Sequence, residues 1–254
     1  MPFTFSHPAI VLPLKKIKPE WFSLTGLVIG SMSPDLLYFF QMSGEEDYGH
    51  TFPGIFVFDL PATLLLTLIF HLWIRNTLIL YLPSPLNRKF AKYLPQNIFL
   101  FLRKNWHIVL FSAFIGAISH LLWDEAGNTQ GWVYKQAPDF FGKELAIGPF
   151  NYQIYVYIEY IGSLVGLLAI GWVLFNEPGE NSLPPISAQA KFGFWFSVLF
   201  FTGAVIILKQ SIENHTYSMG SLFVIGISGF FLGIIITCLL FKRWKPNSKP
   251  VDFT

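Results

Sequence analysis

The chain has 254 residues and a formal net charge of +2, with 53% hydrophobic and only 13% charged residues and a mean hydropathy of +0.49. Soluble domains carry roughly a quarter charged residues, so this composition excludes an ordinary soluble protein and predicts an integral membrane protein. Its single cysteine, Cys238, excludes an intrachain disulfide. The first residues lack the basic stretch of a cleavable signal peptide, so we expect none.

The N-terminal region predicts a helical hairpin. Residues 7–17 are short and mostly apolar, lysines lie at the expected turn, and residues 21–35 are apolar again. At 1.5 Å per residue the first arm covers only about 16 Å, so we expect a short re-entrant helix. Such elements are tolerated where other helices bury them. Residues 21–40 are also long enough for a weaker span.

Five longer apolar stretches predict spanning helices, because about 20 apolar residues cross a bilayer. They lie at 54–75, 106–124, 154–175, 191–209 and 219–241. Residues 76–105 mix prolines, apolar residues and five lysine or arginine residues, which predicts a loop with an interfacial amphipathic helix. We therefore expect an all-α polytopic membrane protein with about six spans. Residues 1–175 would form a motif-bearing core, and residues 191–241 two further spans of the same domain.

Charge placement predicts the orientation, because lysine and arginine are enriched on the cytoplasmic side. These residues gather in 76–105 and after residue 241, whereas loops 42–52 and 210–218 have none. The pattern puts 76–105, 176–190 and the C-terminus inside, and 42–52, 125–153 and 210–218 outside. We predict a bacterial cytoplasmic membrane protein with both termini toward the cytoplasm, apart from the first residues.

A histidine and an aspartate end the stretch 106–124. His120 and Asp124 are four residues apart, so they share one helix face, and no charge lies between residues 108 and 118. Ionisable groups at such a position are costly and usually functional. Comparable apolar borders carry His7, Asp35 and His50. Imidazole and carboxylate bind zinc, so the five predict a site for zinc or another divalent metal near the extracytoplasmic face.

Each of these residues also has a structural explanation. His120 and Asp124 fit a hydrogen-bonded pair at a helix end, and Asp35 fits a turn residue after a proline. His50 fits an exposed loop, and His7 fits the residue before a helix that begins with proline. Asp59 fits a buried carboxyl bonded to a neighbouring helix, or a group that orients a ligand histidine.

Several motifs resemble those of a known family. They are Phe3-Thr4-Phe5-Ser6-His7-Pro8-Ala9, Gly30-Ser31-Met32-Ser33-Pro34-Asp35, Gly49-His50-Thr51, Phe58-Asp59-Leu60-Pro61 and the string from Gly116 to Asp124. In this order, over about residues 2–175, they resemble the bacterial membrane proteins of the domain of unknown function 4184 family. The resemblance brings no established activity. That family is loosely similar to predicted membrane-bound metal-dependent hydrolases, which is a likeness by analogy.

One position departs from the family pattern. The resemblance implies a further histidine four residues after Asp124, where this chain has Asn128. Asparagine is a poor zinc ligand but can hydrogen-bond, so we place Asn128 with Asp59 around the ligands. Either Glu125 or Asp47 compensates for the missing imidazole, or this member has lost the metal or the chemistry.

Two functions fit these residues. In a metal-dependent hydrolase, the three histidines would bind one divalent ion together with Asp35 or Asp124. The other carboxylate would act as general base toward a membrane-resident ester or phosphoester. In a non-enzymatic membrane protein, the His/Asp cluster would be a structural knot, which means a set of metal or hydrogen-bond contacts that holds the N-terminal hairpin against the third span. Transport would need charges near the bilayer midplane, where only Asp59 and Glu159 lie.

Other chemistries lack their motifs. The sequence has no glycine-rich phosphate loop, no Cys-x-x-Cys, no Gly-x-Ser-x-Gly and no His-Glu-x-x-His. Its basic residues follow the predicted inner membrane surface, so we expect membrane lipids and no nucleic acid as partners. Glycine pairs at 26/30, 162/166 and 229/233 allow close helix contacts, within the fold or in a homo-oligomer.

Overall fold

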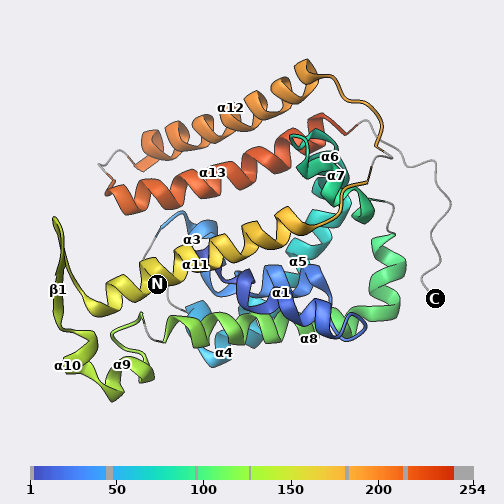
Figure 1. The fold of residues 1–254 in the computed structure, drawn as a ribbon. Helices are drawn as coiled ribbons and strands as arrows, with labels where there is room; N and C mark the ends of the chain where they lie inside the picture. The colour runs from blue at the N-terminus through green and yellow to red at the C-terminus, as the bar shows by residue number, and fades with distance from the viewer. Residues whose placement is uncertain are drawn as a thin grey trace. The chain divides into compact units, whose positions relative to one another are not determined.

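The computed structural model describes residues 3–43, 48–94, 97–125, 127–180, 183–213 and 217–242 (Figure 1). Five of its helices are long and apolar enough to cross a membrane: Phe52–Tyr81, Ile98–Asp124, Ile154–Asn176, Ala188–Glu213 and Met219–Leu240. The chain is thus an all-α integral membrane protein, as the composition predicted. Asp47 and the basic residues after Lys242 lie outside the described residues.

The N-terminal helical hairpin is present. Helices α1 (Pro8–Ile17) and α2 (Leu24–Gly30) are both short and pack on each other. The turn between them is closed by Lys15, whose Nζ donates to the carbonyl oxygens of Pro19 and Phe22 at 2.6 and 2.8 Å. Both ends of the hairpin therefore lie on the side away from this lysine.

The weaker span at 21–40 is not a single helix, so the structure has five long apolar helices where we predicted about six spans. Helix α2 ends at Gly30, a 3-10 turn η2 (Ser33–Asp35) follows, and α3 (Leu36–Gln41) begins afresh. Pro34 lacks a backbone N–H and restricts the residue before it, so the helix is interrupted here. The break leaves Asp35 at the junction of two short helices.

The predicted loop 76–105 is shorter than expected because helices extend into it from both sides. The first long helix combines α4 (Phe52–Gly54), the π-helical η4 (Ile55–Asp59), α5 (Leu60–Ile69), the π-helical η5 (Phe70–Ile74) and α6 (Arg75–Tyr81). Helix α8 (Ile98–Asp124) starts earlier than predicted and leaves helical geometry at Asn105. Within the described residues of this loop, the predicted amphipathic helix corresponds to the short α7 (Leu86–Phe90) and η6 (Ala91–Tyr93).

A small antiparallel β-hairpin was not predicted. After α9 (Trp132–Gln136) and α10 (Pro138–Phe141), strands β1 (Glu144–Ile147) and β2 (Phe150–Gln153) pair across a two-residue turn. Gly148 in that turn has a φ of +60°, which suits glycine. Strand β2 runs straight into α11 (Ile154–Asn176).

The chain forms two compact units. The first contains the residues up to Leu36 together with Tyr48–Leu64 and His107–Phe175, and the second contains the rest. In the second, α12 (Ala188–Glu213) packs along α13 (Met219–Leu240), and the core gathers around Phe194 and Cys238. The glycine pairs named above lie at contacts within the chain.

In the first unit, α2 and α8 approach backbone to backbone. A Cβ on Gly30 would lie 2.5 Å from the carbonyl oxygen of Ala113, and a Cβ on Gly116 would lie 2.6 Å from the Ser31 nitrogen. Contacts between small residues allow this distance in membrane proteins. The contact sets the end of α2 beside the last turns of α8, where His120 lies.

Candidate metal centre

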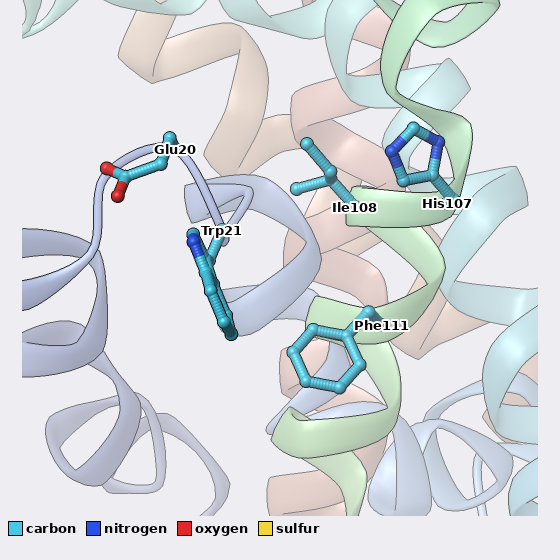
Figure 2. Close-up of a pocket in the computed structure, with 5 residues that line it drawn as sticks. All are labelled: Glu20, Trp21, His107, Ile108 and Phe111. Atoms are coloured by element: carbon cyan, nitrogen blue, oxygen red, sulfur yellow. The ribbon is translucent and has the colours of Figure 1, made fainter.

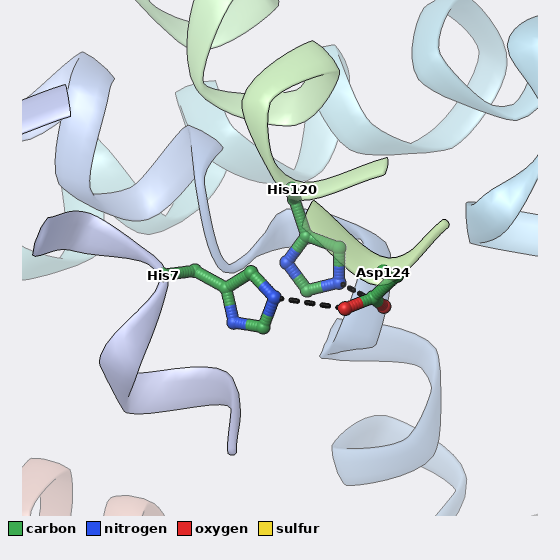
Figure 3. A group of neighbouring side chains, drawn as sticks. All are labelled: His7, His120 and Asp124. Atoms are coloured by element: carbon green, nitrogen blue, oxygen red, sulfur yellow. Dashed lines mark hydrogen bonds and ion pairs between the residues drawn. The ribbon is translucent and has the colours of Figure 1, made fainter. Parts of the chain in front are cut away.

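The five side chains predicted as metal ligands lie together in the first unit. His7 immediately precedes α1, Asp35 ends η2, His50 ends η3 (Tyr48–His50), and His120 and Asp124 lie in the last turns of α8. The exposed fraction is at most 4% for four of these residues, and 7% for the side chain of His50. The helical hairpin therefore brings His7 to the end of α8 (Figure 3).

Four of these side chains place nitrogen and oxygen atoms at a common spacing. His120 Nε2 lies 3.3 Å from His50 Nε2, 3.3 Å from Asp124 Oδ2 and 3.5 Å from Asp35 Oδ1. His50 Nε2 lies 3.2 Å from Asp35 Oδ1 and 3.6 Å from Asp124 Oδ2. Atoms bound at about 2.0–2.2 Å to a tetrahedral zinc ion are about 3.3–3.6 Å apart. These five separations, each of which involves an imidazole nitrogen of His50 or His120, match that spacing.

The tautomer of His120 follows from its backbone contact. Its Nδ1 donates to the carbonyl oxygen of Ser31 at 2.8 Å, so in the neutral ring Nε2 carries the lone pair. Metal-binding histidines usually donate their other N–H to a carbonyl or carboxylate, which fixes the ring and its tautomer. The lone pair on Nε2 of His120 therefore faces His50 and the two carboxylates.

The N-terminal segment holds the outer oxygen of each carboxylate. His7 Nε2 lies 3.0 Å from Asp124 Oδ1, and its ring stacks on that of His120 with centroids 3.8 Å apart. Thr4 Oγ1 donates to Asp35 Oδ2 at 2.5 Å. Each carboxylate thus has one oxygen held from the N-terminal segment, while its other oxygen faces the two remaining imidazoles.

Contacts within the cluster lower the pKa of Asp35 and raise the pKa of His50. Burial would raise the pKa of Asp35, but hydrogen bonds from His120 and His50 outweigh it and hold this pKa below its usual range. Burial would lower the pKa of His50, but the adjacent carboxylates of Asp124 and Asp35 raise it above its ordinary value. A divalent cation bound here would compete with protons for the His50 ring, since metal ligands must be deprotonated.

Two overlapping sets of residues in the described chain could hold a metal ion. One is His7, His120 and Asp124, and the other is Asp35, His50 and His120; within each set the ligand atoms lie within 4.8 Å of one another. His120 belongs to both sets.

A family model for the domain of unknown function 4184 (DUF4184) matches residues 1–239. The chain belongs to this family. The match confirms the resemblance drawn from the motifs, and extends it through most of α13. No curated protein and no solved structure matches this DUF4184 chain, and the likeness to metal-dependent hydrolases is not shown by any comparison.

The two residues expected around the ligands differ in placement. Asp59 is fully buried within η4, and its carboxylate oxygens have no hydrogen-bond partner in the described part of the chain. It lies within electrostatic range of Asp35, His50 and His120. Asn128 instead caps its own loop, because its Oδ1 accepts from the Gln130 N–H at 2.9 Å. Its place around the ligands stays a prediction.

Glu125 is also occupied in the loop after α8. One of its carboxylate oxygens accepts from the backbone N–H of Trp132 at 2.5 Å. This contact ties the end of α8 to the start of α9. The compensation that we considered for the missing histidine therefore finds no support in the position of Glu125.

A separate pocket lies at the other end of the N-terminal hairpin (Figure 2). It is lined by Glu20, Trp21, His107, Ile108 and Phe111. His107 precedes His120 by thirteen residues, which is about 20 Å along a helix. The pocket contains none of the five clustered side chains, so we assign it no part in the metal centre.

Proposed function

We propose that the DUF4184 chain binds one divalent ion of the zinc class, with His50, His120, Asp35 and Asp124 as ligands. The supporting observation is the set of five separations of 3.2–3.6 Å between their ligand atoms. Two buried carboxylates that share the same pair of imidazoles are costly unless cations or hydrogen bonds compensate them. A divalent ion compensates both at once.

In this arrangement His7 and Thr4 position the ligands. Each holds the second oxygen of one carboxylate, His7 on Asp124 and Thr4 on Asp35. Such outer contacts orient ligands and raise metal affinity. His7 is also the alternative ligand, since it forms a possible metal-binding set with His120 and Asp124.

The reaction that best fits this centre is hydrolysis of an ester or phosphoester carried by a membrane-resident molecule. A bound divalent ion supplies Lewis acidity and lowers the pKa of a water molecule. For this reaction one of the two carboxylates, Asp35 or Asp124, would leave the ion and accept the proton of that water as general base. The other carboxylate and the two imidazoles would remain ligands. The supporting observation is position: the cluster lies at the end of the apolar helix α8 in a membrane protein.

A structural knot is the second candidate, and burial favours it. Structural zinc sites are closed, whereas catalytic ones keep a position open to substrate. Here the clustered side chains are nearly inaccessible and join four segments of the first unit. Such a knot would hold the N-terminal hairpin against α8 without any turnover.

Metal analysis with a matched pair of histidine variants tests the metal centre. The protein is purified in detergent, loaded with zinc, desalted and measured by mass spectrometry of its metal content. We expect about one ion per chain for the parent and for His107→Ala, because His107 is an exposed histidine of the same helix. His120→Ala should lose the ion. A parent that takes up no zinc, or a His120→Ala variant that keeps it, contradicts the proposal.

The two roles of the centre are then separated with Asp124→Asn. A panel of phospholipid and polyprenyl phosphate esters serves as substrate, and size-exclusion chromatography reports the folded protein. A hydrolase loses turnover in Asp124→Asn while folded protein is retained. A knot shows no turnover in the parent on any ester, and the variant loses folded protein.

A further inference from the structure

The β1–β2 hairpin has one apolar and one polar face. Leu145 pairs with Tyr152, and Ile147 pairs with Phe150. Residues directly opposite each other in an antiparallel pair, and alternate residues along a strand, lie on the same face. These four large side chains therefore share one face. The other face carries Glu144, Ala146, Asn151 and Gln153, with the Asn151 amide donating to the Glu144 carboxylate at 3.1 Å.

The apolar face is uncovered in the first unit. Its four side chains, Leu145, Ile147, Phe150 and Tyr152, keep exposed fractions of 42%, 53%, 55% and 42%. An isolated two-stranded hairpin is only marginally stable in water. Burial of its apolar face against another apolar surface would stabilise it. The hairpin therefore calls for an apolar surface that covers these side chains.

Tyr157 of α11 holds the β1–β2 hairpin against the start of α11. Its hydroxyl contacts both strands, at 3.0 Å from the Leu145 carbonyl oxygen and 3.2 Å from that of Phe150. The ring of Tyr152 packs on those of Tyr157 and Tyr160, with centroids 5.9 and 6.3 Å apart. The apolar face thus continues directly onto the side of α11 that carries Tyr160.

That side of α11 is apolar and exposed, which is typical of a lipid-facing surface. Only 6% of the apolar window of this helix is buried within the chain. Tyr160, Ile161, Leu164, Val165 and Leu168 have exposed fractions between 56% and 62%. A 23-residue apolar helix with such a surface lies against acyl chains, and tyrosine is enriched where that surface meets the headgroups.

We propose that the β1–β2 hairpin is a membrane-interface anchor, whose apolar face dips into the lipid beside the N-terminal end of α11. Lipid is the occupant because the apolar face joins the lipid-facing side of α11, while Glu144 and the amides lie on the opposite face. The anchor would hold the loop after α8 against the bilayer. This inference does not depend on a metal ion.

Spin labels on neighbouring residues of β1 test the anchor. Ile147→Cys and Ala146→Cys place a nitroxide on the apolar and polar faces, respectively. The parent chain, whose only cysteine is the buried Cys238, gives the background. The full chain is reconstituted in phosphatidylethanolamine–phosphatidylglycerol vesicles. Collisions of each label with oxygen, which partitions into lipid, and with a water-soluble nickel chelate are measured by electron paramagnetic resonance.

We expect the ratio of oxygen to nickel collisions to be several-fold higher at residue 147 than at residue 146. Equal nickel access at both positions overturns the anchor, because the apolar face would then lie in water. Shielding of residue 147 from both reagents also overturns it, because another protein surface, such as a second copy of the chain, would then cover the face. Parent-like elution in size-exclusion chromatography shows that both labelled variants are folded.

Discussion

The two carboxylate oxygens of Asp35, and likewise those of Asp124, have different contacts. In Asp35, Oδ1 faces His50 and His120, and Oδ2 accepts a hydrogen bond from Thr4. In Asp124, Oδ2 faces the same two histidines, and Oδ1 contacts His7. A carboxylate held at one oxygen loses rotational freedom before any ion binds, so less free energy is lost on binding.

Thr4 provides the cleanest test of this positioning. We expect Thr4→Val, which keeps the shape but removes the hydroxyl, to weaken zinc affinity about 10–100-fold. Thr4→Ser keeps a donor to Asp35 and should bind zinc nearly as the parent does. The measurement is competitive zinc titration of the detergent-purified protein. Parent-like affinity of Thr4→Val would show that the hydroxyl does not orient Asp35.

At this scale the sequence singled out the ionisable side chains that the structure brings together, but not their neutral partners. Residue type and position at apolar borders singled out His7, His50 and His120 with the two aspartates. Thr4 acts on a residue 31 positions away, and the Ser31 carbonyl on one 89 positions away. A hydroxyl or a backbone carbonyl carries no sequence signal for such a contact. Asn128, chosen from the family pattern, instead caps a loop.

Among the elements, the α2–α8 contact determines whether Ser31 reaches His120. A Cβ on Gly116 would lie 2.6 to 2.7 Å from backbone atoms at the end of α2, which side-chain rotation cannot relieve. We expect Gly116→Ala to lower the free energy of unfolding by about 1–3 kcal/mol, the usual cost of overpacking.

Denaturant titration in mixed micelles, followed by circular dichroism, measures this change. Gly171→Ala is the matched control, because a Cβ on Gly171 of α11 meets nothing within 4 Å. It should leave stability unchanged or slightly raise it, since alanine favours helix. Equal stability of the two variants would mean that the helices can separate without cost.

The sequence predicted those helices whose positions follow from the length of an apolar stretch. The five long apolar helices and the short helical hairpin follow from run length, but the ends of the helices do not. The first long helix continues past Arg75 and Asn76 to Tyr81, and α8 already begins at Ile98, before Arg103 and Lys104. The break at Pro34 lay within the predicted weak span. The β-hairpin was not predicted, because its two strands have only four residues each and the one local signal is the turn at Gly148, whose φ is +60°.

For the whole molecule, the side of the membrane on which the cluster lies is still a prediction from loop charges. Cysteine substitutions at exposed positions on opposite sides test it. A membrane-impermeant maleimide should label Asp139→Cys in intact cells, because loop 125–153 is predicted outside. Glu180→Cys should react only after permeabilisation, because loop 176–190 is predicted inside. The reverse pattern would place the cluster at the cytoplasmic face.

The ion itself is tested most directly by X-ray absorption at the zinc edge of the loaded protein. Four nitrogen or oxygen ligands at about 2.0–2.1 Å, with outer-shell scattering from two imidazole rings, are expected for His50, His120, Asp35 and Asp124. This signal should vanish in His120→Ala and persist in His107→Ala. A spectrum without imidazole scattering, or one with sulfur ligands, would contradict a centre built from these four side chains.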